Sequence, residues 1–413
     1  MSSKTAIKEF ASIKHGFAFE GKYFSSEKQE HILLTPGNFH VDQKLYFGSN
    51  TKYYRGPIPE DYVLSKDDLL VVMTDLTKNM AILGNAVILK SELPVLHNQR
   101  IGLVQSKPDI SKDYLCYLLN SEHVKKYVKA TASGTTVRHT SPSKILDVKV
   151  HIPPLPEQRK IAKILSTWDK AISTTERLID NSKQQKKALM QQLLTGKKRL
   201  FDDSGKPFEG EWKQVHMEEA CFVNPKKSVK PADGLVSFVP MDAVSEDTKL
   251  IRHELKRYDE VSKGFTSFAN QDCLVAKITP CFENGKGAYV DNLHNGTGFG
   301  STEFHVLRAR EGNCTKFFYY ITQTREFRVR GEMNMQGSAG QKRVTTDYLK
   351  LFKVNIPPTL VEQQKVASVL SKADQEIELL EQQLADLRQE KKALMQQLLT
   401  GKRRVIVDEK EVA

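Results

Sequence analysis

The 413-residue sequence has few cysteines, and their spacing marks no structural site. Its five cysteines include no Cys-x-x-Cys and no paired Cys/His spacing, which argues against a disulfide framework and against a structural zinc site. No run approaches the roughly 20 apolar residues that span a bilayer, and the first ten residues lack the apolar stretch of a signal peptide. We therefore expect a soluble intracellular protein with reduced thiols.

Motifs of nucleotide-dependent catalysis are also missing. The chain contains no Gly-x-x-x-x-Gly-Lys-Ser/Thr phosphate loop, which argues against an ATP-driven motor, and no Asn-Pro-Pro-aromatic motif of an amino-methyltransferase. Histidines occur singly, without a nucleophile at a recognisable spacing. A loose Asp…Glu-x-Lys pattern of metal-dependent nucleases occurs around Glu211–Lys213, but the first half of the chain has no counterpart. An enzyme is therefore the less favoured class.

The length, composition and charge of the chain limit its number of domains and its kind of partner. A chain of 413 residues is too long for one ordinary core, so two or three domains are expected. A hydrophobic content of 39% is enough to build these cores, which excludes a wholly disordered chain. The formal net charge of +12 favours a polyanionic partner but says nothing about the fold.

A direct repeat organises the chain. The segment Lys186–Lys197 recurs letter for letter as Lys391–Lys402, 205 residues later. Upstream, Lys149–Pro154 resembles Lys353–Pro358. Twelve consecutive identities do not arise by chance, so the chain is a duplicated half of about 205 residues, each half a variable domain followed by a well-matched segment.

Each well-matched segment is predicted to be a long helix. Its apolar residues alternate at spacings of four and three, which is typical of a coiled-coil seam. Gly196 and Gly401 stand where helix C-caps are expected. The seam residues that we expect to pair are Ile161, Leu165, Trp168, Ile172, Ile179, Leu189 and Leu193 in the first helix, and Val366, Leu370, Ile377, Leu380, Leu384, Leu387, Leu394 and Leu398 in the second.

The two helices are predicted to pair with each other in antiparallel orientation. Residues 157–199 carry eleven Lys and Arg against four acids, whereas residues 362–413 carry nine against ten, so their charges are complementary. Parallel pairing would need the chain to retrace the full helix length. Antiparallel pairing would bring Leu165 near Leu398 rather than Leu370. Two separate coiled coils, each formed with another molecule, remain the alternative.

The domains are expected to have an α+β fold. Strand-like runs occur at 69–73, 86–89, 101–104 and 145–152, separated by turn-forming residues. One helix per domain is expected, at 114–129 and at 316–330. The predicted boundaries are 1–156 and 200–361 for the variable domains, 157–199 and 362–403 for the helices, and 404–413 for a tail.

Basic residues gather near the end of each predicted domain helix and in the glycine-rich loop that follows it. Such side chains suit phosphate contacts, and Arg or Gln on a loop can bind a base edge. A second polar set lies in matching loops earlier in each domain. The candidate DNA contacts are Thr74, Lys78, Asn79, Lys125, Lys126, Lys129, Arg138 and His139 in the first domain, and Lys277, Thr279, Asn284, Lys286, Arg325, Arg328, Arg330, Gln341, Lys342 and Arg343 in the second. Each is alone also typical of a solvated surface, but their matched placement favours nucleic-acid binding.

The well-matched segments resemble a known family. Pro-Pro followed by Leu-x-Glu-Gln and ending in Leu-Leu-Thr-Gly-Lys, within Ile152–Lys197 and again within Ile356–Lys402, resembles the specificity subunit of type I restriction-modification enzymes. Gly210–Lys213 resembles the opening of a target recognition domain in that family. The resemblance covers the chain end to end. It implies two target recognition domains of α+β fold separated by two long antiparallel coiled-coil helices, with a pseudo-two-fold internal repeat.

The resemblance also implies a function without catalysis in this chain. Each variable domain would read one half of a bipartite, asymmetric DNA target, and the helices would set the spacing and dock two methyltransferase subunits. Restriction subunits, which provide the motor and the nuclease, would join the full complex in a prokaryotic cytoplasm. S-adenosylmethionine, ATP and Mg²⁺ would bind those partner subunits and not this chain. A stand-alone two-headed DNA nuclease or modifying enzyme is the alternative.

The helix length bounds the gap between the half-sites. Residues 157–195 would form a helix of roughly 58 Å at 1.5 Å per residue, which limits the spacing to about 17 base pairs. Overhang of the domains is expected to bring the half-site centres nearer to one helical turn of DNA.

Overall fold

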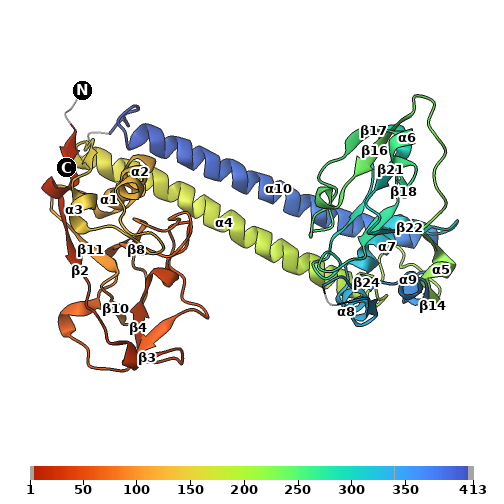
Figure 1. Ribbon diagram of the computed structural model, residues 1–413, viewed down its shortest axis with the longest axis horizontal. Helices are drawn as coiled ribbons and strands as arrows, with labels where there is room; N and C mark the ends of the chain where they lie inside the picture. The colour runs from red at the N-terminus through yellow and green to blue at the C-terminus, as the bar shows by residue number, and fades with distance from the viewer. Residues whose placement is uncertain (1–3, 339, 408–413) are drawn as a thin grey trace. The chain divides into compact units, whose positions relative to one another are not determined.

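The computed structural model describes residues 4–338 and 340–407. The chain forms two compact units: unit 1 comprises Met1–Glu176 and Gln382–Ala413, and unit 2 comprises Arg177–Glu381. The two longest helices, α4 (Leu155–Leu193) and α10 (Leu360–Leu398), each contribute one half to either unit (Figure 1). Each unit therefore contains one variable domain together with half of each long helix.

Unit 1 combines short helices with two main sheets. Its helices, besides its parts of α4 and α10, are α1 (Lys112–Leu119), α2 (Glu122–Ala130) and α3 (Pro142–Leu146). Its strands are β1 (Thr5–Ala6), β2 (Ala11–His15), β3 (Phe24–Ser25), β4 (His31–Leu34), β5 (Lys52–Tyr54), β6 (Val63–Leu64), β7 (Leu69–Val72), β8 (Thr74–Asp75), β9 (Ala86–Ile88), β10 (Val95–His97), β11 (Ile101–Ser106), β12 (Arg138–His139) and β13 (Lys149–Val150).

Unit 2 has a matching set of elements. Its helices, besides its parts of α4 and α10, are α5 (Met217–Ala220), α6 (Tyr258–Val261), α7 (Thr315–Thr322), α8 (Arg325–Met333) and α9 (Thr346–Leu351). Its strands are β14 (Lys213–His216), β15 (Cys221–Val223), β16 (Leu235–Val239), β17 (Glu254–Arg257), β18 (Thr266–Ala269), β19 (Cys273–Ala276), β20 (Gly287–Tyr289), β21 (Thr297–Gly300), β22 (Phe304–Ala309), β23 (Met335–Gln336), β24 (Arg343–Val344) and β25 (Lys353–Ile356).

The two units share one sheet topology. The order β2-β11-β7-β9 in unit 1 corresponds to β15-β22-β19-β20 in unit 2, and both sheets are antiparallel. A second sheet in each unit contains one parallel pair, β4 with β10 and β16 with β21. The variable domains are thus copies of one fold, although their sequences differ. The expected α+β class and internal repeat are confirmed.

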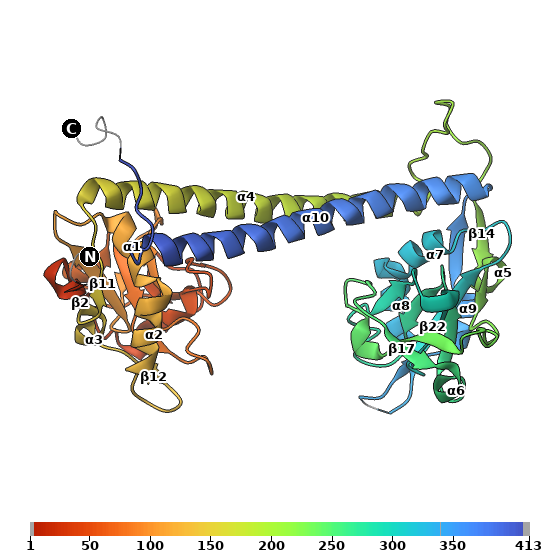
Figure 2. The ribbon, with the colours of Figure 1, turned by 90° about the horizontal axis from the view of Figure 1, so that it is seen from above.

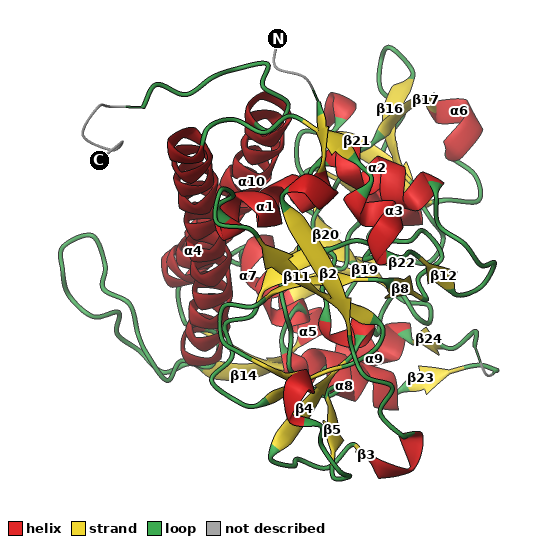
Figure 3. Ribbon diagram, turned by 90° about the vertical axis from the view of Figure 1, so that its left-hand side faces the viewer, coloured by secondary structure: helices red, strands yellow, loops and turns green. Residues whose placement is uncertain are grey.

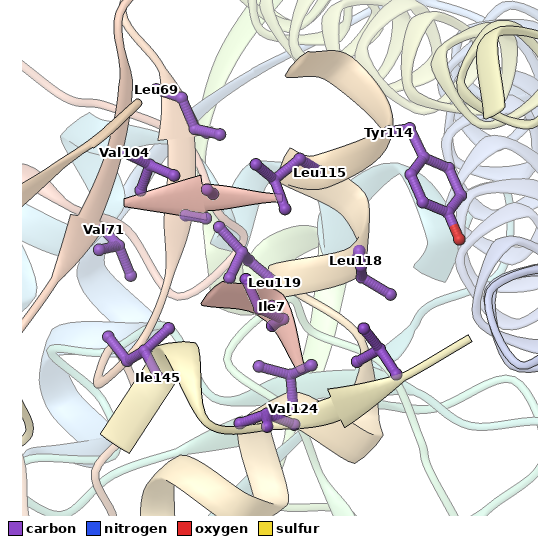
Figure 4. Packing of buried hydrophobic residues seen from close by; sticks show 14 of the residues in the cluster. Ile7, Leu69, Val71, Val104, Tyr114, Leu115, Leu118, Leu119, Val124 and Ile145 are labelled. Atoms are coloured by element: carbon purple, nitrogen blue, oxygen red, sulfur yellow. The ribbon is translucent and has the colours of Figure 1, made fainter. Parts of the chain in front are cut away.

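The central strand of each first sheet is buried on both faces. In β7, Leu69 and Val71 pack with the domain helices, whereas Leu70 and Val72 pack toward the second sheet. Figure 3, in which unit 1 faces the viewer, shows α1, α2 and α3 beside β2 and β11. Figure 4 shows the cluster on the helix side, where leucines of α1 meet the side chains of β7 and β11. Because both faces of β7 are buried, the sequence of this strand is a continuous apolar run, and not the alternating pattern of a strand with one exposed face.

The long helices run antiparallel within each unit, as predicted. Leu165 of α4 and Leu398 of α10 belong to one core in unit 1, while Leu370 belongs to the core of unit 2. In each unit, residues with increasing numbers along α4, or just after it, contact residues with decreasing numbers along α10, or just after it. The contacts are Glu157 with Arg404, Asp169 with Lys391 and Glu176 with Arg388 in unit 1, and Glu362 with Arg199, Asp374 with Lys186 and Glu381 with Lys183 in unit 2.

Both predicted C-caps are confirmed. Gly196 and Gly401 have a φ of +71°, in the left-handed region that ends a helix. Space also requires glycine at the first position, because a Cβ on Gly196 would lie 2.9 Å from the ring of Trp212. Each helix begins two residues earlier than predicted, and they end at Leu193 and Leu398, before the predicted boundaries at 199 and 403.

Three local predictions were wrong. The single helices expected at 114–129 and at 316–330 are each two helices, α1 with α2 and α7 with α8. The Ser121 hydroxyl accepts the Val124 N–H and begins a new helix, and Thr324 acts in the same way before α8. Of the strand expected at 145–152, the first two residues belong to the end of helix α3, and only β13, Lys149–Val150, is strand. Here Ser141 caps α3, and Pro142 occupies its first turn.

Within the described part of the chain, no helix is both long and apolar enough to span a membrane.

Candidate nucleic-acid interface

The structure brings the two predicted loop sets of the first domain together. Strand β8 pairs with β12 in antiparallel register, with Thr74 opposite His139 and Asp75 opposite Arg138. Oγ1 of Thr74 lies 3.1 Å from Nδ1 of His139. The loop after β7 and the basic hairpin of residues 133–139 therefore form one surface, which we call cluster 1. The sequence identified both parts of this surface but not their contact.

The second domain contains the same arrangement, which we call cluster 2. The Thr279 N–H donates to the Lys342 carbonyl at 3.0 Å, and the Val344 N–H donates to the Lys277 carbonyl at 2.8 Å. These bonds join the loop of residues 277–286, which follows β19, to the hairpin of β23 and β24. In the view of Figure 2, each hairpin extends from its own unit on the side away from the long helices.

Several candidate side chains in the two clusters and on the helices α2 and α8 are accessible. The exposed ones are Lys78, Asn79, Lys126, His139, Arg325, Arg330, Asn284, Gln341, Lys342 and Arg343. Lys129, Arg138, Lys277, Thr279 and Lys286 are half-buried. Each cluster presents exposed cations or histidine and exposed amides, which can contact phosphates and base edges respectively.

Three of these candidates already have protein partners. Arg343 donates through Nε and Nη2 to the carboxylate of Glu303, at 3.1 and 2.9 Å for Oε1. Nη2 of Arg330 lies 2.9 Å from Oε1 of Glu326. Arg138 donates to the Gly134 carbonyl at 2.5 Å, and therefore closes its own hairpin.

Three candidates face inward. Thr74 is buried. Lys125 on α2 donates to the side-chain carbonyl of Asn85, and burial lowers the pKa of Lys125 to about 7. Arg328 on α8 donates to two main-chain carbonyls, and burial lowers the pKa of Arg328 to about 10. These residues lie behind the loops and not on their accessible face.

Sequence reasoning missed the groups that hold the clusters from within. Asp75 is fully buried and accepts the N–H groups of Thr77, Ile82 and Leu83, at 2.6, 2.8 and 2.8 Å. His305 is also buried, and its Nε2 lies 2.9 Å from the Val344 carbonyl in β24. An aspartate two residues after the apolar run 69–73 was the available signal for Asp75, because Asp readily accepts N–H groups two residues on.

The predicted seam residues differ in burial. Ile161, Leu165, Ile172, Ile179, Leu193, Val366, Leu370, Ile377 and Leu398 are buried. Trp168, Leu189, Leu380, Leu384, Leu387 and Leu394 are half-buried. The most deeply buried ones lie near the helix ends, where the long helices also pack on the domain helices and sheets.

The loose nuclease-like pattern at Glu211–Lys213 has a structural role. Trp212 Nε1 donates to Glu362 at 3.4 Å, and Lys213 pairs with Ile356 in the sheet of β14 and β25. Across residues 4–338 and 340–407, no group of three or more His, Cys, Asp and Glu side chains could hold a metal ion.

Comparison with known proteins agrees with the duplicated architecture. The family model described as the type I restriction modification DNA specificity domain matches twice, at residues 5–182 and 211–389. The EcoEI specificity subunit of Escherichia coli is 36% identical over 189 residues, which cover 45% of this chain but 32% of that protein. The match thus spans about a third of that relative's length.

Two further comparisons cover most of the chain. The MjaVIII specificity subunit of Methanocaldococcus jannaschii is 25% identical over 403 residues, 88% of each chain. The crystal structure of the type I restriction-modification S subunit from M. genitalium superposes with a TM-score of 0.56 over 96% of both chains, at 14% identity, which shows a shared fold. Two matches of the family model that together span most of the sequence show that this chain belongs to the type I restriction-modification DNA specificity family.

Proposed function

We propose that this chain is the DNA sequence-specificity subunit of a type I restriction-modification complex. Its variable domains, residues 1–156 and 200–361, would each read one half of a bipartite target through clusters 1 and 2. The observation that carries this proposal is the same junction of loop and basic hairpin at the same topological place in both units. Two similar but chemically different surfaces suit two different half-sites.

The accessible side chains of the two clusters support an asymmetric target. Cluster 1 presents Asn79 and His139, whereas cluster 2 presents Gln341 and Lys342. An Asn or Gln side chain can make a bidentate contact with adenine, while Lys can donate to guanine or to phosphate. Because these groups differ between the units, the half-sites are expected to differ in sequence.

The long helices are proposed to set the spacing and to dock two methyltransferase subunits. Packing explains why Leu193 and Leu398 match within the twelve-residue repeat, because both are buried. It does not explain why exposed positions match, such as Lys187 with Lys392 and Gln192 with Gln397. A partner that binds in two identical copies would require identical surfaces at both places.

The proposed boundaries of the helical segments are 157–199 and 362–403, followed by a tail at 404–413. Arg199 and Arg404 support the match of the two ends, because each donates to the first glutamate of the other segment, Glu362 and Glu157. Residues 408–413 of the tail lie outside the described residues. Catalysis, together with S-adenosylmethionine, ATP and Mg²⁺, is assigned to the methyltransferase and restriction subunits of a complex in a prokaryotic cytoplasm.

The discriminating experiment uses the purified chain. It is expected to bind DNA with an affinity that falls with salt, and to leave the DNA uncut and unmethylated when Mg²⁺ and S-adenosylmethionine are supplied. Added methyltransferase subunits are expected to restore methylation. Cleavage or methylation by the chain alone would instead support a stand-alone nuclease or modifying enzyme.

A further inference from the structure

Two half-buried cations occupy equivalent places behind clusters 1 and 2. Lys125 follows the helix cap Ser121 by four residues, and Arg328 follows the helix cap Thr324 by four residues. Both side chains point from the second domain helix toward the loop that follows the central strand. The sequence placed both among the DNA contacts, but neither lies on the accessible face of its cluster.

Arg328 holds the loop of cluster 2 by its main chain. Nη1 donates to the Phe282 carbonyl at 3.2 Å, and Nη2 donates to the Gly285 carbonyl at 3.0 Å. The guanidinium carbon also lies 4.9 Å from the centre of the Phe282 ring, which is fully buried. One planar side chain thus binds two acceptors and one aromatic ring of the same loop.

The segment held by Arg328 is a tight turn. The Phe282 N–H donates to Ile278 and the Asn284 N–H donates to Pro280, at 3.0 and 2.9 Å. The Phe282 carbonyl also accepts the Gly285 N–H at 2.9 Å, so Arg328 gives this carbonyl a second donor and binds the carbonyl at the end of the turn, that of Gly285, as well. Asn284 is exposed on this turn and its amide donates to Glu246 at 2.8 Å, so the position of the amide depends on the turn's conformation and on this contact.

Lys125 acts on the loop of cluster 1 through side chains. It donates to Asn85, whose amide in turn donates to the His40 carbonyl at 3.1 Å. The ammonium also interacts electrostatically with Asp75, whose carboxylate accepts N–H groups of the same loop, among them those of Thr77 and Leu83. Lys78 and Asn79 are exposed at the outer end of this loop.

We propose that Arg328 and Lys125 are positioning residues: they fix the reading loops 277–286 and 75–85 from behind, so that discrimination at each half-site depends on a side chain that does not touch DNA. This inference rests on the proposed function. Its physical basis is that a base contact requires a donor or acceptor held at a defined place, whereas a phosphate contact requires only nearby charge.

The test compares Arg328→Met with Arg325→Met in the assembled complex. Arg325 is exposed on the same helix, three residues earlier, and serves as the matched control. Binding to the methylation target and to unrelated DNA is measured over a range of salt. Arg328→Met is expected to lose about tenfold or more of its preference for one half-site while the salt dependence stays unchanged, because no phosphate contact is removed. Arg325→Met is expected to lower the salt slope by about one and to keep the preference.

Two results would overturn the inference. One is a salt slope for Arg328→Met that falls as it does for Arg325→Met, since Arg328 would then be a phosphate contact. The other is a preference for the target that equals that of the unchanged chain. A complex of the unchanged chain that shows no sequence preference at all would instead contradict the proposed function.

Hydrogen exchange keeps the inference testable if Arg328→Met fails to fold. Arg328→Lys retains the charge but lacks the planar guanidinium that binds the two carbonyls in a fixed geometry. Amide exchange of residues 282–286 is expected to accelerate about tenfold in this variant, while the exchange rates in the strands of unit 2 stay unchanged. Equal protection of this turn in the variant and in the unchanged chain would contradict a positioning role, whatever the DNA preference.

Discussion

Nζ of Lys391 on α10 lies 2.6 Å from Oδ1 of Asp169 on α4, in unit 1. The Tyr117 hydroxyl donates to the other carboxylate oxygen at 2.6 Å, so that one carboxylate links both long helices to a domain helix. Lys186 and Tyr320 repeat this arrangement around Asp374 in unit 2, at 2.6 and 2.8 Å. The duplication therefore preserves a three-way junction and not only a helix seam.

Removing the charge at either junction is expected to destabilise the chain. In Asp169→Asn, the ammonium of Lys391, whose side chain is 16% exposed, loses its counter-ion, at a cost of about 1 to 2 kcal/mol. Asp374→Asn is expected to cost more, because Asp374 is 26% exposed against 43% for Asp169. Chemical denaturation measures both. Asp386→Asn, on the exposed face of α10, is the control, and an equal loss in all three variants would refute the junction.

Arg199 is expected to contribute more to the stability of the chain than its exposed neighbours. Its guanidinium binds both oxygens of Glu362 at 2.7 Å, and that carboxylate is only 1% exposed. Arg199→Met would leave a buried charge without its partner, at a cost of about 3 kcal/mol or more. Lys198→Met, at an exposed position next to it, is expected to change the unfolding midpoint little. Comparable midpoints for the two variants would contradict this account of Glu362.

Neighbouring cations of the second hairpin are expected to contribute unequally to DNA binding. Lys342 is exposed, whereas Arg343 is held by Glu303. Lys342→Met is therefore expected to weaken binding to all sequences and to lower the salt slope by about 0.9. Arg343→Met is expected to lower it less, because its charge is already compensated. Titrations at several salt concentrations measure both slopes; a larger effect of Arg343→Met would reverse the assignment.

Lys125 is expected to make stability depend on pH. Burial lowers the pKa of Lys125 to about 7 from an ordinary value of 10.5, so the unfolded chain binds more protons between these pH values. The cost of the buried charge is fully present below pH 7 and is relieved as the pH rises toward 10.5. Relative to Lys125→Met, the Tm of the unchanged chain is therefore expected to rise by a few degrees between pH 7 and 9.5. Parallel pH profiles for the two chains would show that Lys125 is solvated. Lys126→Met, at an exposed position, is the control.

The sequence predicted the parts of the fold that depend on periodicity. The twelve-residue repeat and the seam from Ile161 to Leu193 indicated two long helices, and charge complementarity indicated that they pair. Antiparallel orientation followed from connectivity. The glycine at each helix end was predictable because helices commonly end on a residue in the left-handed conformation, which glycine adopts most easily.

The remaining features depend on contacts between residues distant in sequence. The pairing of Thr74 with His139 joins segments 65 residues apart, and no local pattern encodes that register. The orientation of Lys125 and Arg328 was also not predictable, because an amphipathic helix indicates its buried face but not which cation turns inward. The break at Ser121 had a local signal, a capping residue before an acidic one, which the apolar pattern around it outweighed.

The most direct test of the central claim replaces one variable domain and reads the resulting methylation. Residues 200–361 are exchanged for the corresponding domain of another family member, and the methylated motif is determined by sequencing the genome of cells that also contain the methyltransferase subunits. The account predicts that one half of the bipartite motif changes while the other half and the gap stay the same. A change in both halves, or in neither, would contradict the claim that each domain reads its own half-site.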